Sequence, residues 1–249
     1  MLEQSILWGS PPAKLVLSND DVHVWCAVLD QPAARVEQLA QTLSEDEKAR
    51  SDRFYFEQHR KRFIIARGLL RTILGRYLNI APNLVNFSYG SQGKPALAED
   101  LAASSLQFNV SHSEDLALYA VTRDRAVGID IEYIRPMADA EQLAERFFAA
   151  KEAEVLRSLP EHLKQQAFFN CWTRKEAYVK ACGDGLSQPL NQFEVSLIPG
   201  EPAKLLSIAG SIEAAANWQM QDLKPVDGYA GAIALSGNNW QIHCFSWLD

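Results

Sequence analysis

The chain has few cysteines and no arrangement of residues typical of a zinc site. Its 249 residues include four cysteines, with no CxxC pair and no cluster among the five histidines: Cys26, Cys171, Cys182 and Cys244. This scarcity argues against a structural zinc site and against a disulfide scaffold. It favours a reducing compartment, so we expect a cytoplasmic protein.

Long hydrophobic runs are also missing. No apolar stretch approaches the roughly 20 residues that span a bilayer. Residues 1–12 lack the basic stretch and apolar run of a signal peptide. Neither a P-loop nor a GxGxxG motif occurs, which argues against the standard nucleotide-binding folds. Apolar residues make up 47% and charged residues 22%, a balance typical of a globular protein, so we expect no membrane association.

The charge is acidic overall but unevenly distributed. A net charge of −7 argues against a general nucleic-acid binder. Between positions 48 and 76, however, nine basic residues accompany only Asp52 and Glu57, so this segment carries +7 and the remainder −14. Such asymmetry indicates one local anion site. Arg53, Arg60 and Arg67 recur every seven residues, which is typical of one solvated helix face. Most of the basic side chains in this segment therefore need no bound anion to explain them.

The hydrophobic pattern predicts two halves with a similar order of elements. A capping box at Ser44 and Glu47 and large apolar residues every seven positions predict a long helix at 57–78, preceded by a shorter one. Strands and helices are expected in the following ranges: strands at 22–29, 106–111, 116–122 and 126–131, helices at 32–42, 138–149, 151–158 and 161–181, and short strands within 192–247. This order suggests an ancient duplication, although no repeat is evident residue by residue.

Two acidic side chains share one face of a predicted strand. In VGIDIE at 127–132, Asp130 and Glu132 point to the same side, and the intervening apolar residues point to the other. Two neighbouring carboxylates repel each other unless a cation lies between them. Two solvated acids at a strand end explain this hexapeptide equally well, so the pattern alone leaves both interpretations open.

The predicted helix at 161–181 contains a second charged group. Glu176 and Lys180 are one turn apart, and an exposed pair of this kind would contribute only ~0.3–0.5 kcal/mol. Yet Trp172, Tyr178 and Val179 make the helix apolar around much of its circumference. Ionised groups in such a helix need partners.

Three carboxylates with nearby lysines match the requirements of a magnesium diphosphate. Asp130, Glu132 and Glu176 offer oxygen ligands, which magnesium and manganese prefer. Lysines would neutralise charge on the phosphate and on the leaving group.

The two charged motifs together resemble the signature of the Sfp-type 4′-phosphopantetheinyl transferases. VGIDIE at 127–132 is followed by WTRKEAYVK at 172–180, and 46 positions separate Asp130 from Glu176. The order and spacing make the pair highly specific. Three further segments are similar to family motifs: GKP at 93–95, FNVSHS at 108–113 and RFIIARG at 62–68. The likeness spans residues 43–190.

The resemblance implies an activity and a set of roles. The protein would transfer 4′-phosphopantetheine from coenzyme A to a serine of an apo acyl or peptidyl carrier protein and release 3′,5′-ADP. The resemblance implies magnesium, or manganese, on Asp130, Glu132 and Glu176. It also implies catalytic roles for Asp130, Glu176 and Lys180, with Lys180 stabilising charge and Glu176 orienting or deprotonating the serine. Contacts with coenzyme A are implied for Arg62, Lys94, Ser111, His112, Lys175 and Lys180, of which Arg62 and His112 would bind the 3′-phosphate.

The fold that we expect is α+β: a pseudo-twofold pair of similar α/β subdomains, each a small sheet packed on a long helix, with the active site in the cleft between them. Residues 1–124 would contact the 3′-phosphate and adenine of coenzyme A. Residues 125–249 would hold the metal and diphosphate and dock the carrier. We expect a monomer, serving fatty-acid, polyketide or nonribosomal peptide synthesis.

Two other functions remain compatible with these residues. A magnesium-dependent phosphohydrolase or nuclease also uses clustered carboxylates, although the acidic net charge argues against a nuclease. A non-catalytic domain could bind coenzyme A or a carrier protein. The complete set of three carboxylates favours an enzyme.

Overall fold

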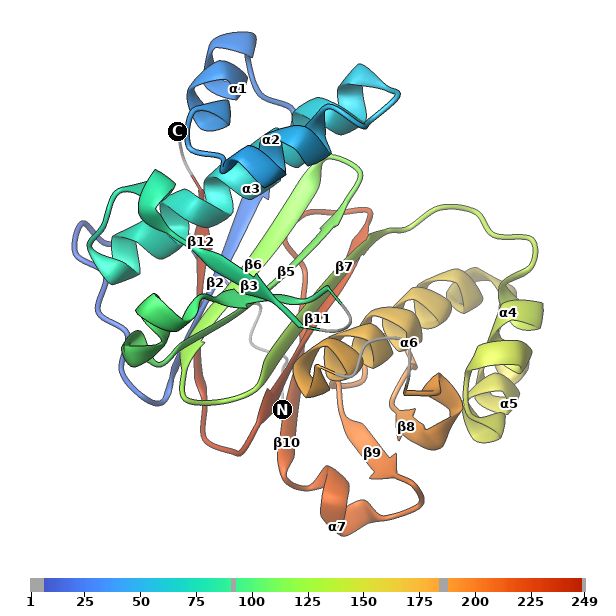
Figure 1. The fold of residues 1–249 in the computed structure, drawn as a ribbon. Coiled ribbons are helices and arrows are strands. Elements are labelled where there is room, and N and C mark those ends of the chain that lie inside the picture. Colours follow the sequence, from blue (N-terminus) through green and yellow to red (C-terminus); the bar gives the residue numbers. More distant parts are fainter. Residues whose placement is uncertain (1–6, 91–92, 184–187, 248–249) are drawn as a thin grey trace.

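The computed structural model describes residues 7–90, 93–183 and 188–247, and these form two halves with the same succession of elements (Figure 1). The N-terminal half contains β2 (Asp21–Val28), α1 (Ala33–Ala40), α2 (Glu45–Ser51), α3 (Glu57–Leu78), β3 (Phe87–Tyr89), β4 (Pro95–Leu97), β5 (Leu106–Ser113) and β6 (Leu116–Arg123). The C-terminal half contains β7 (Val127–Tyr133), α4 (Ala140–Phe147), α5 (Ala150–Ser158), α6 (Glu161–Cys182), β8 (Phe193–Val195), β9 (Leu205–Ile208), β10 (Trp218–Leu223) and β11 (Tyr229–Ser236). The short helix α7 (Ile212–Ala215), between β9 and β10, corresponds in position to a 3-10 helix (Glu99–Ser104) between β4 and β5, whereas β1 (Trp8–Gly9) and β12 (Gln241–Ser246) lie outside the repeated order. The expected α+β fold with two similar halves is confirmed.

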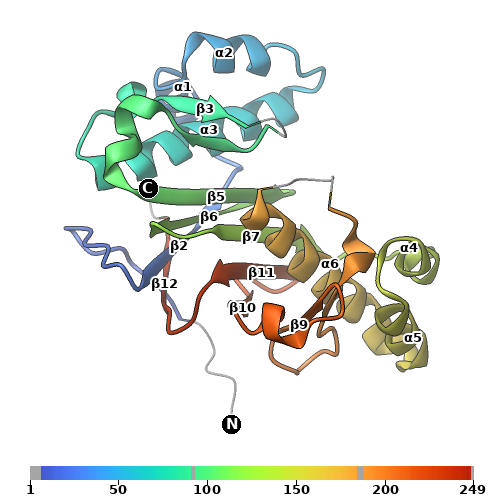
Figure 2. The same cartoon turned by 60° about the horizontal axis from the view of Figure 1, so that its bottom comes forward.

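The two main sheets repeat one strand order. The larger sheet has the order β1-β12-β2-β6-β5, and the smaller has the order β10-β11-β7. The run β2-β6-β5 therefore matches β7-β11-β10. The inner faces of the sheets pack together around Val24, Leu118, Ile129 and Ile233, while α3 covers the outer face of the first sheet and α6 that of the second (Figure 2). Alternation along each strand, one residue inward and the next outward, produces this layering.

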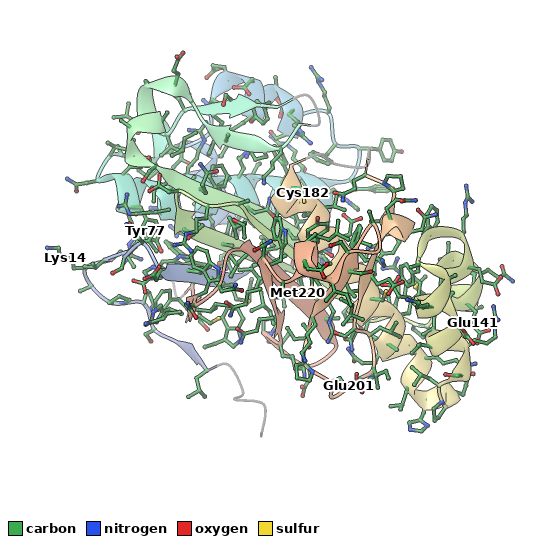
Figure 3. The ribbon with its side chains drawn as sticks, turned by 90° about the horizontal axis from the view of Figure 1, so that it is seen from below. Lys14, Tyr77, Glu141, Cys182, Glu201 and Met220 are labelled. Carbon is green, nitrogen blue, oxygen red and sulfur yellow. The ribbon has the colours of Figure 1, made fainter. Side chains whose placement is uncertain are left out.

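The two long helices begin and end in similar ways. Each has 22 residues, and each is followed by a residue in the left-handed region that ends the helix, Asn79 with φ 55° and Gly183 with φ 82°. The predicted helix at 57–78 is confirmed, and α6 extends one residue beyond its predicted end. Figure 3 shows Tyr77 and Cys182, which lie in the last turn of α3 and of α6 respectively.

A buried ion pair shows the duplication at the level of residues. Glu57 and Glu161, the first residues of the long helices, are 104 positions apart, and so are Arg71 and Lys175. Arg71 pairs with Glu47 at 2.6 Å, and Lys175 pairs with Glu152 at 2.8 Å. Each carboxylate also accepts the backbone N–H three residues before it, at the start of the preceding helix. The pair is formed by arginine in one half and by lysine in the other.

The C-terminal strand belongs to the sheet of the N-terminal half, although the expected boundary at residue 124 would assign it to the other half. β7 begins at Val127, close to that boundary, but β12 pairs in parallel with β2 in the sheet of the N-terminal half. This pairing satisfies the otherwise open edge of β2. It also places Cys244 in the core between the sheets and Phe245 against the core under α3.

Arg67 also differs from the expectation of a solvated helix face. Its side chain is only 11% exposed, lies 2.8 Å from Glu47 and stacks over the ring of Phe87. Arg53 is exposed, as expected. Glu47 therefore holds two arginines, because its buried carboxylate needs compensation by positive charge.

Two expectations from composition can be compared with the structure. All four cysteines are thiols, so the expected absence of disulfides holds for these residues. Among the described residues, no helix has both the length and the apolar character to cross a membrane.

Candidate active site

A glycine on β7 brings α6 against the strand that carries the acidic residues. Gly128, Asp130 and Glu132 lie on the face of β7 that points to α6. A Cβ atom at Gly128 would lie 2.0 Å from the carbonyl oxygen of Ala177 and 2.3 Å from the nitrogen of Ala181. Only glycine permits this approach, which brings the charged face of α6 to the carboxylates. The motifs VGIDIE and WTRKEAYVK are therefore parts of one contact.

Asp130 lies at the centre of the resulting cluster. It is 3% exposed, and its Oδ1 accepts hydrogen bonds from the ammonium of Lys180 at 2.6 Å and from the hydroxyl of Ser111 at 2.8 Å. Lys180 also donates to the Ser111 oxygen at 3.1 Å. These bonds connect strands of both halves with α6, as expected for a site between the halves.

Glu132 and Glu176 lie close enough to Asp130 to interact with its charge. Desolvation by burial, and then the negative charge of Asp130, raise the pKa of Glu132 above its usual value. The same two causes raise the pKa of Glu176, and Glu132 adds to the effect, while Lys180 opposes it. Three carboxylates therefore share one negative potential, which a cation would relieve.

The chemistry of these oxygens fits a divalent cation. The Oδ2 atom of Asp130 is buried and has no hydrogen-bond partner among the described residues. An orphaned carboxylate oxygen of this kind is costly unless a ligand satisfies it. The donor set, carboxylate oxygens only, suits magnesium or manganese. Within the described part of the chain, no three His, Cys, Asp or Glu side chains converge as closely as bound metal ligands do. Lys180 occupies the other oxygen of Asp130 instead.

The residues expected at the 3′-phosphate lie beside the cluster. Arg62, on the second turn of α3, pairs with Glu114 at 3.1 Å and lies 3.6 Å from Asp30. His112 lies next to Ser111, on β5, which extends two residues beyond its predicted end. Desolvation lowers the pKa of His112, and the charges of Lys180 and Arg62 lower it further. The ring therefore lies in a positive field, although part of it is exposed to solvent.

Lys94 and Ser111 have structural partners in addition to the contacts expected with coenzyme A. Lys94 donates to the backbone carbonyl of Lys180, and its ammonium lies 3.5 Å from that of Val127, so it links the GKP segment to the end of α6. Burial lowers the pKa of Lys94. The Ser111 hydroxyl donates one hydrogen bond and accepts from Lys180 and from the N–H of Ile131, which uses its whole bonding capacity.

Lys175 is the expected site residue that the structure does not bring to the cluster. Its side chain is 0% exposed, and its ammonium pairs with Glu152 and donates to the backbone carbonyls of Leu190 and Phe193. Positions 175 and 176 point about 100° apart on a helix, so Glu176 can face β7 while Lys175 faces the interior. A phosphate contact would require Lys175 to abandon a buried carboxylate. The expected phosphate contact is therefore corrected: Lys175 joins α6 to Glu152 of α5 and to the backbone at Leu190 and Phe193.

Three residues contribute to the site in ways that the sequence analysis did not assign. They are Gly128, which lets α6 approach, and Asn109 and Ser113, which lie on the same face of β5 as Ser111 and bond to β7. The signal was present in the sequence: polar residues at 109, 111 and 113 recur every second position and therefore share one face of the strand.

Among the described residues, the equivalent place in the N-terminal half contains aromatic side chains instead of a carboxylate cluster. Arg76 occupies the position that corresponds to Lys180 by the offset of the long helices, and it stacks over Trp25 of β2. The indole of Trp25 donates to the hydroxyl of Tyr77 at 3.0 Å and packs against Phe245. Aromatic side chains therefore occupy the place in this half that the carboxylates of Asp130 and Glu132 occupy at the junction of β5, β7 and α6.

The comparisons with known proteins agree with this geometry. Residues 126–234 match the family model of the 4′-phosphopantetheinyl transferase superfamily, and residues 31–124 match that of the 4′-phosphopantetheinyl transferase N-terminal domain. The chain is 50% identical over 234 residues to the 4′-phosphopantetheinyl transferase HetI of Nostoc sp., which covers 94% of this chain and 95% of that protein. It is 36% identical to the 4′-phosphopantetheinyl transferase psf-1 of Bacillus pumilus, over 68% of this chain and 71% of that one. A human relative, L-aminoadipate-semialdehyde dehydrogenase-phosphopantetheinyl transferase, is 28% identical over 78% of this chain and 67% of its own length.

The matched segments contain Asp130, Glu176 and Lys180 in one model and Arg62 and His112 in the other. The chain belongs to the 4′-phosphopantetheinyl transferase family, whose members transfer phosphopantetheine from coenzyme A to carrier proteins.

Proposed function

We propose that the cluster around Asp130 is where this enzyme transfers 4′-phosphopantetheine to a serine of an apo carrier protein, with magnesium. The observation that carries the proposal is the Asp130 carboxylate itself. One of its oxygens is held by Lys180, and the other is buried without a partner, beside Glu132 and Glu176. This arrangement leaves one oxygen available to a cation and keeps a lysine next to it for a phosphate.

The reaction is a phosphoryl-type substitution at the β-phosphorus of coenzyme A. The serine oxygen forms a new P–O bond, the bond from the β-phosphorus to the bridging oxygen breaks, and 3′,5′-ADP leaves with the electron pair. The serine proton passes to a base. Magnesium, held by Asp130, Glu132 and Glu176, would neutralise charge on the diphosphate oxygens when bound.

Lys180 and Glu176 have the properties that the two remaining roles require. The Lys180 side chain is 28% exposed, so its ammonium can turn from Asp130 to the phosphate oxygens on which charge gathers. Glu176 lies one helical turn away on the same face of α6. Its carboxylate lies near Asp130 and Glu132, and we propose that it orients the serine hydroxyl or accepts its proton.

Arg62 and His112 are proposed to bind the 3′-phosphate of coenzyme A. In the structure Arg62 pairs with Glu114 and Asp30, which an incoming phosphate would replace. Both residues belong to the N-terminal half, so coenzyme A would span both halves. We therefore propose that the adenosine end contacts residues 1–124 and the diphosphate contacts residues 125–249.

We also propose that the enzyme is a cytoplasmic monomer. Four thiols suit a reducing compartment. The single chain supplies residues of both halves to the site, so no second copy is needed to complete it. Its carrier would come from fatty-acid, polyketide or nonribosomal peptide synthesis.

Intact-protein mass spectrometry of apo carrier proteins from these three classes tests the proposal. Each carrier is incubated with the enzyme, coenzyme A and magnesium, with EDTA as the control. We expect a mass increase of one phosphopantetheine that EDTA abolishes. Consumption of coenzyme A without a modified carrier would instead indicate the phosphohydrolase, and no consumption of coenzyme A with any carrier would contradict the proposal.

A further inference from the structure

Side chains, rather than a backbone ladder, join the edges of the two main sheets. β5 is the last strand of one sheet and β7 the last strand of the other. Three backbone N–H groups of β7 donate to three side chains of β5, each 20 positions earlier: Ile129 to Asn109 at 2.8 Å, Ile131 to Ser111 at 3.3 Å and Tyr133 to Ser113 at 3.0 Å. These bonds give acceptors to the backbone N–H groups along the edge of β7, which would otherwise lack hydrogen-bond partners.

Two of these three side chains also hold a carboxylate. The Ser111 hydroxyl donates to Asp130 Oδ1 at 2.8 Å, and the Ser113 hydroxyl donates to Glu132 Oε2 at 2.9 Å. A hydroxyl has a single proton to donate, so each serine commits it to the acidic residue. The bond that Asn109 makes among the described residues is to the backbone, from the N–H of Ile129. Asn109 therefore joins the two strands, whereas Ser111 and Ser113 join the strands and also orient a carboxylate.

We propose that Ser113 is a positioning residue that fixes the orientation of Glu132 for the divalent cation. Its hydroxyl is held in place by the N–H of Tyr133, and it holds Glu132 Oε2 in turn, which leaves the other carboxylate oxygen to face the cation. The orientation of Glu132 on the C-terminal half thus depends on the position of β5 from the N-terminal half. The inference rests on the proposed function, because it assigns Glu132 to the metal.

The same argument does not extend to Ser111, whose hydroxyl is part of the cluster with Asp130 and Lys180. Ser113 contacts Glu132 only through its hydroxyl, and a partner one step removed from a metal typically changes metal affinity about 10–100-fold when it is lost. Removing the hydroxyl leaves Glu132 free to rotate, because no other hydrogen bond to its carboxylate is present among the described residues.

The experiment compares Ser113→Ala, Ser113→Thr and Asn109→Ala in the full-length protein. Affinity for Mn²⁺ in the presence of coenzyme A is measured by the electron paramagnetic resonance signal of the unbound ion. Amide hydrogen exchange reports the bonds to β7, and steady-state kinetics separate kcat from the KM for coenzyme A.

For Ser113→Ala we expect Mn²⁺ affinity to fall about 10-fold or more, with the KM for coenzyme A little changed. Ser113→Thr keeps the hydroxyl and should restore the affinity. Asn109→Ala should speed exchange of the Ile129 amide and leave Mn²⁺ affinity near that of the wild type. Wild-type affinity in Ser113→Ala, or an equal loss in Asn109→Ala, would overturn the inference. A wild-type protein that binds no Mn²⁺ with coenzyme A would refute the metal assignment in the proposed function, and the inference with it.

Discussion

Gly128→Ala tests whether the close contact of β7 with α6 creates the site. The added methyl would lie 2.0 Å from the Ala177 carbonyl oxygen, 2.3 Å from the Ala181 nitrogen and 2.9 Å from the Lys180 carbonyl carbon. All three are backbone atoms, so no change of rotamer can relieve the overlap. The helix and the strand must therefore separate.

The size of the separation follows from the same distances. Ordinary contacts begin at 3.4 Å, so the nearest atom must retreat by about 1.4 Å. The bond between Lys180 and Asp130, now 2.6 Å, would lengthen beyond hydrogen-bonding range. A misplacement of about 1 Å can cost 100-fold in rate, equivalent to about 2.7 kcal/mol in activation free energy. Overpacking itself typically costs about 1–3 kcal/mol of stability.

The assay is phosphopantetheine transfer to an apo carrier, together with thermal unfolding. We expect Gly128→Ala to remain folded at the assay temperature and to lose at least about 100-fold in kcat/KM. Gly9→Ala is the matched control, because a Cβ there has no neighbour within 4 Å. A folded Gly128→Ala variant with the wild-type rate would refute the reasoning.

Three further predictions concern the remaining charged residues. Arg62→Ala should raise the KM for coenzyme A about 10–100-fold, because a charge-assisted hydrogen bond contributes about 1.5–3 kcal/mol. The same substitution should have little effect on the KM for 3′-dephospho-coenzyme A. An equal increase in KM with both substrates would exclude a 3′-phosphate contact. The pKa of His112 is lowered in the free enzyme and a bound phosphate would raise it, so coenzyme A should bind with proton uptake and more weakly as the pH rises above the lowered pKa of the free imidazole. Calorimetry in buffers of different ionisation enthalpy should detect this uptake in the wild type and less of it in His112→Asn. Lys175→Met should lower the free energy of unfolding by about 3–5 kcal/mol in urea, because it leaves buried Glu152 without its cation; a loss of transfer at unchanged stability would instead favour the phosphate contact expected from the motif.

Most elements could be predicted from the sequence because their signals are local. The stripe of apolar residues predicted α3 to the residue, and the capping box at Ser44 and Glu47 is present at the start of α2. The partner of β12 was not predictable in this way. Its pairing with β2 joins residues about 220 positions apart, and no local pattern in a short C-terminal strand specifies which edge it will occupy.

Some residues of the candidate site were predicted correctly and one was not, because the sequence shows which side chains share a face but not what each of them contacts. The alternation of a strand correctly placed Asp130 and Glu132 on one face. The helical spacing correctly grouped Glu176 with Lys180, but the motif alone did not separate Lys175 from them. That distinction depends on Glu152, a buried acid on another helix. Motifs identify which residues are constrained, whereas the packing decides whether the constraint serves the substrate or the fold.

The similarity of the two halves gives Lys175 a structural role. The pair of Glu152 with Lys175 repeats that of Glu47 with Arg71 in a half whose corresponding cluster is aromatic. A pair that is present in both halves, with and without the Asp130 cluster beside it, is part of the shared scaffold.

The most direct test of the central claim is Asp130→Asn, which keeps the shape of the side chain and removes its charge. Single-turnover transfer to an apo carrier is followed by intact mass, with thermal unfolding as the check on folding. If the carboxylate is the centre of the site, transfer should fall by about 1,000-fold, the loss expected when a group that stabilises transition-state charge is removed, while the variant stays folded. A folded variant that modifies the carrier at the wild-type rate would contradict the account.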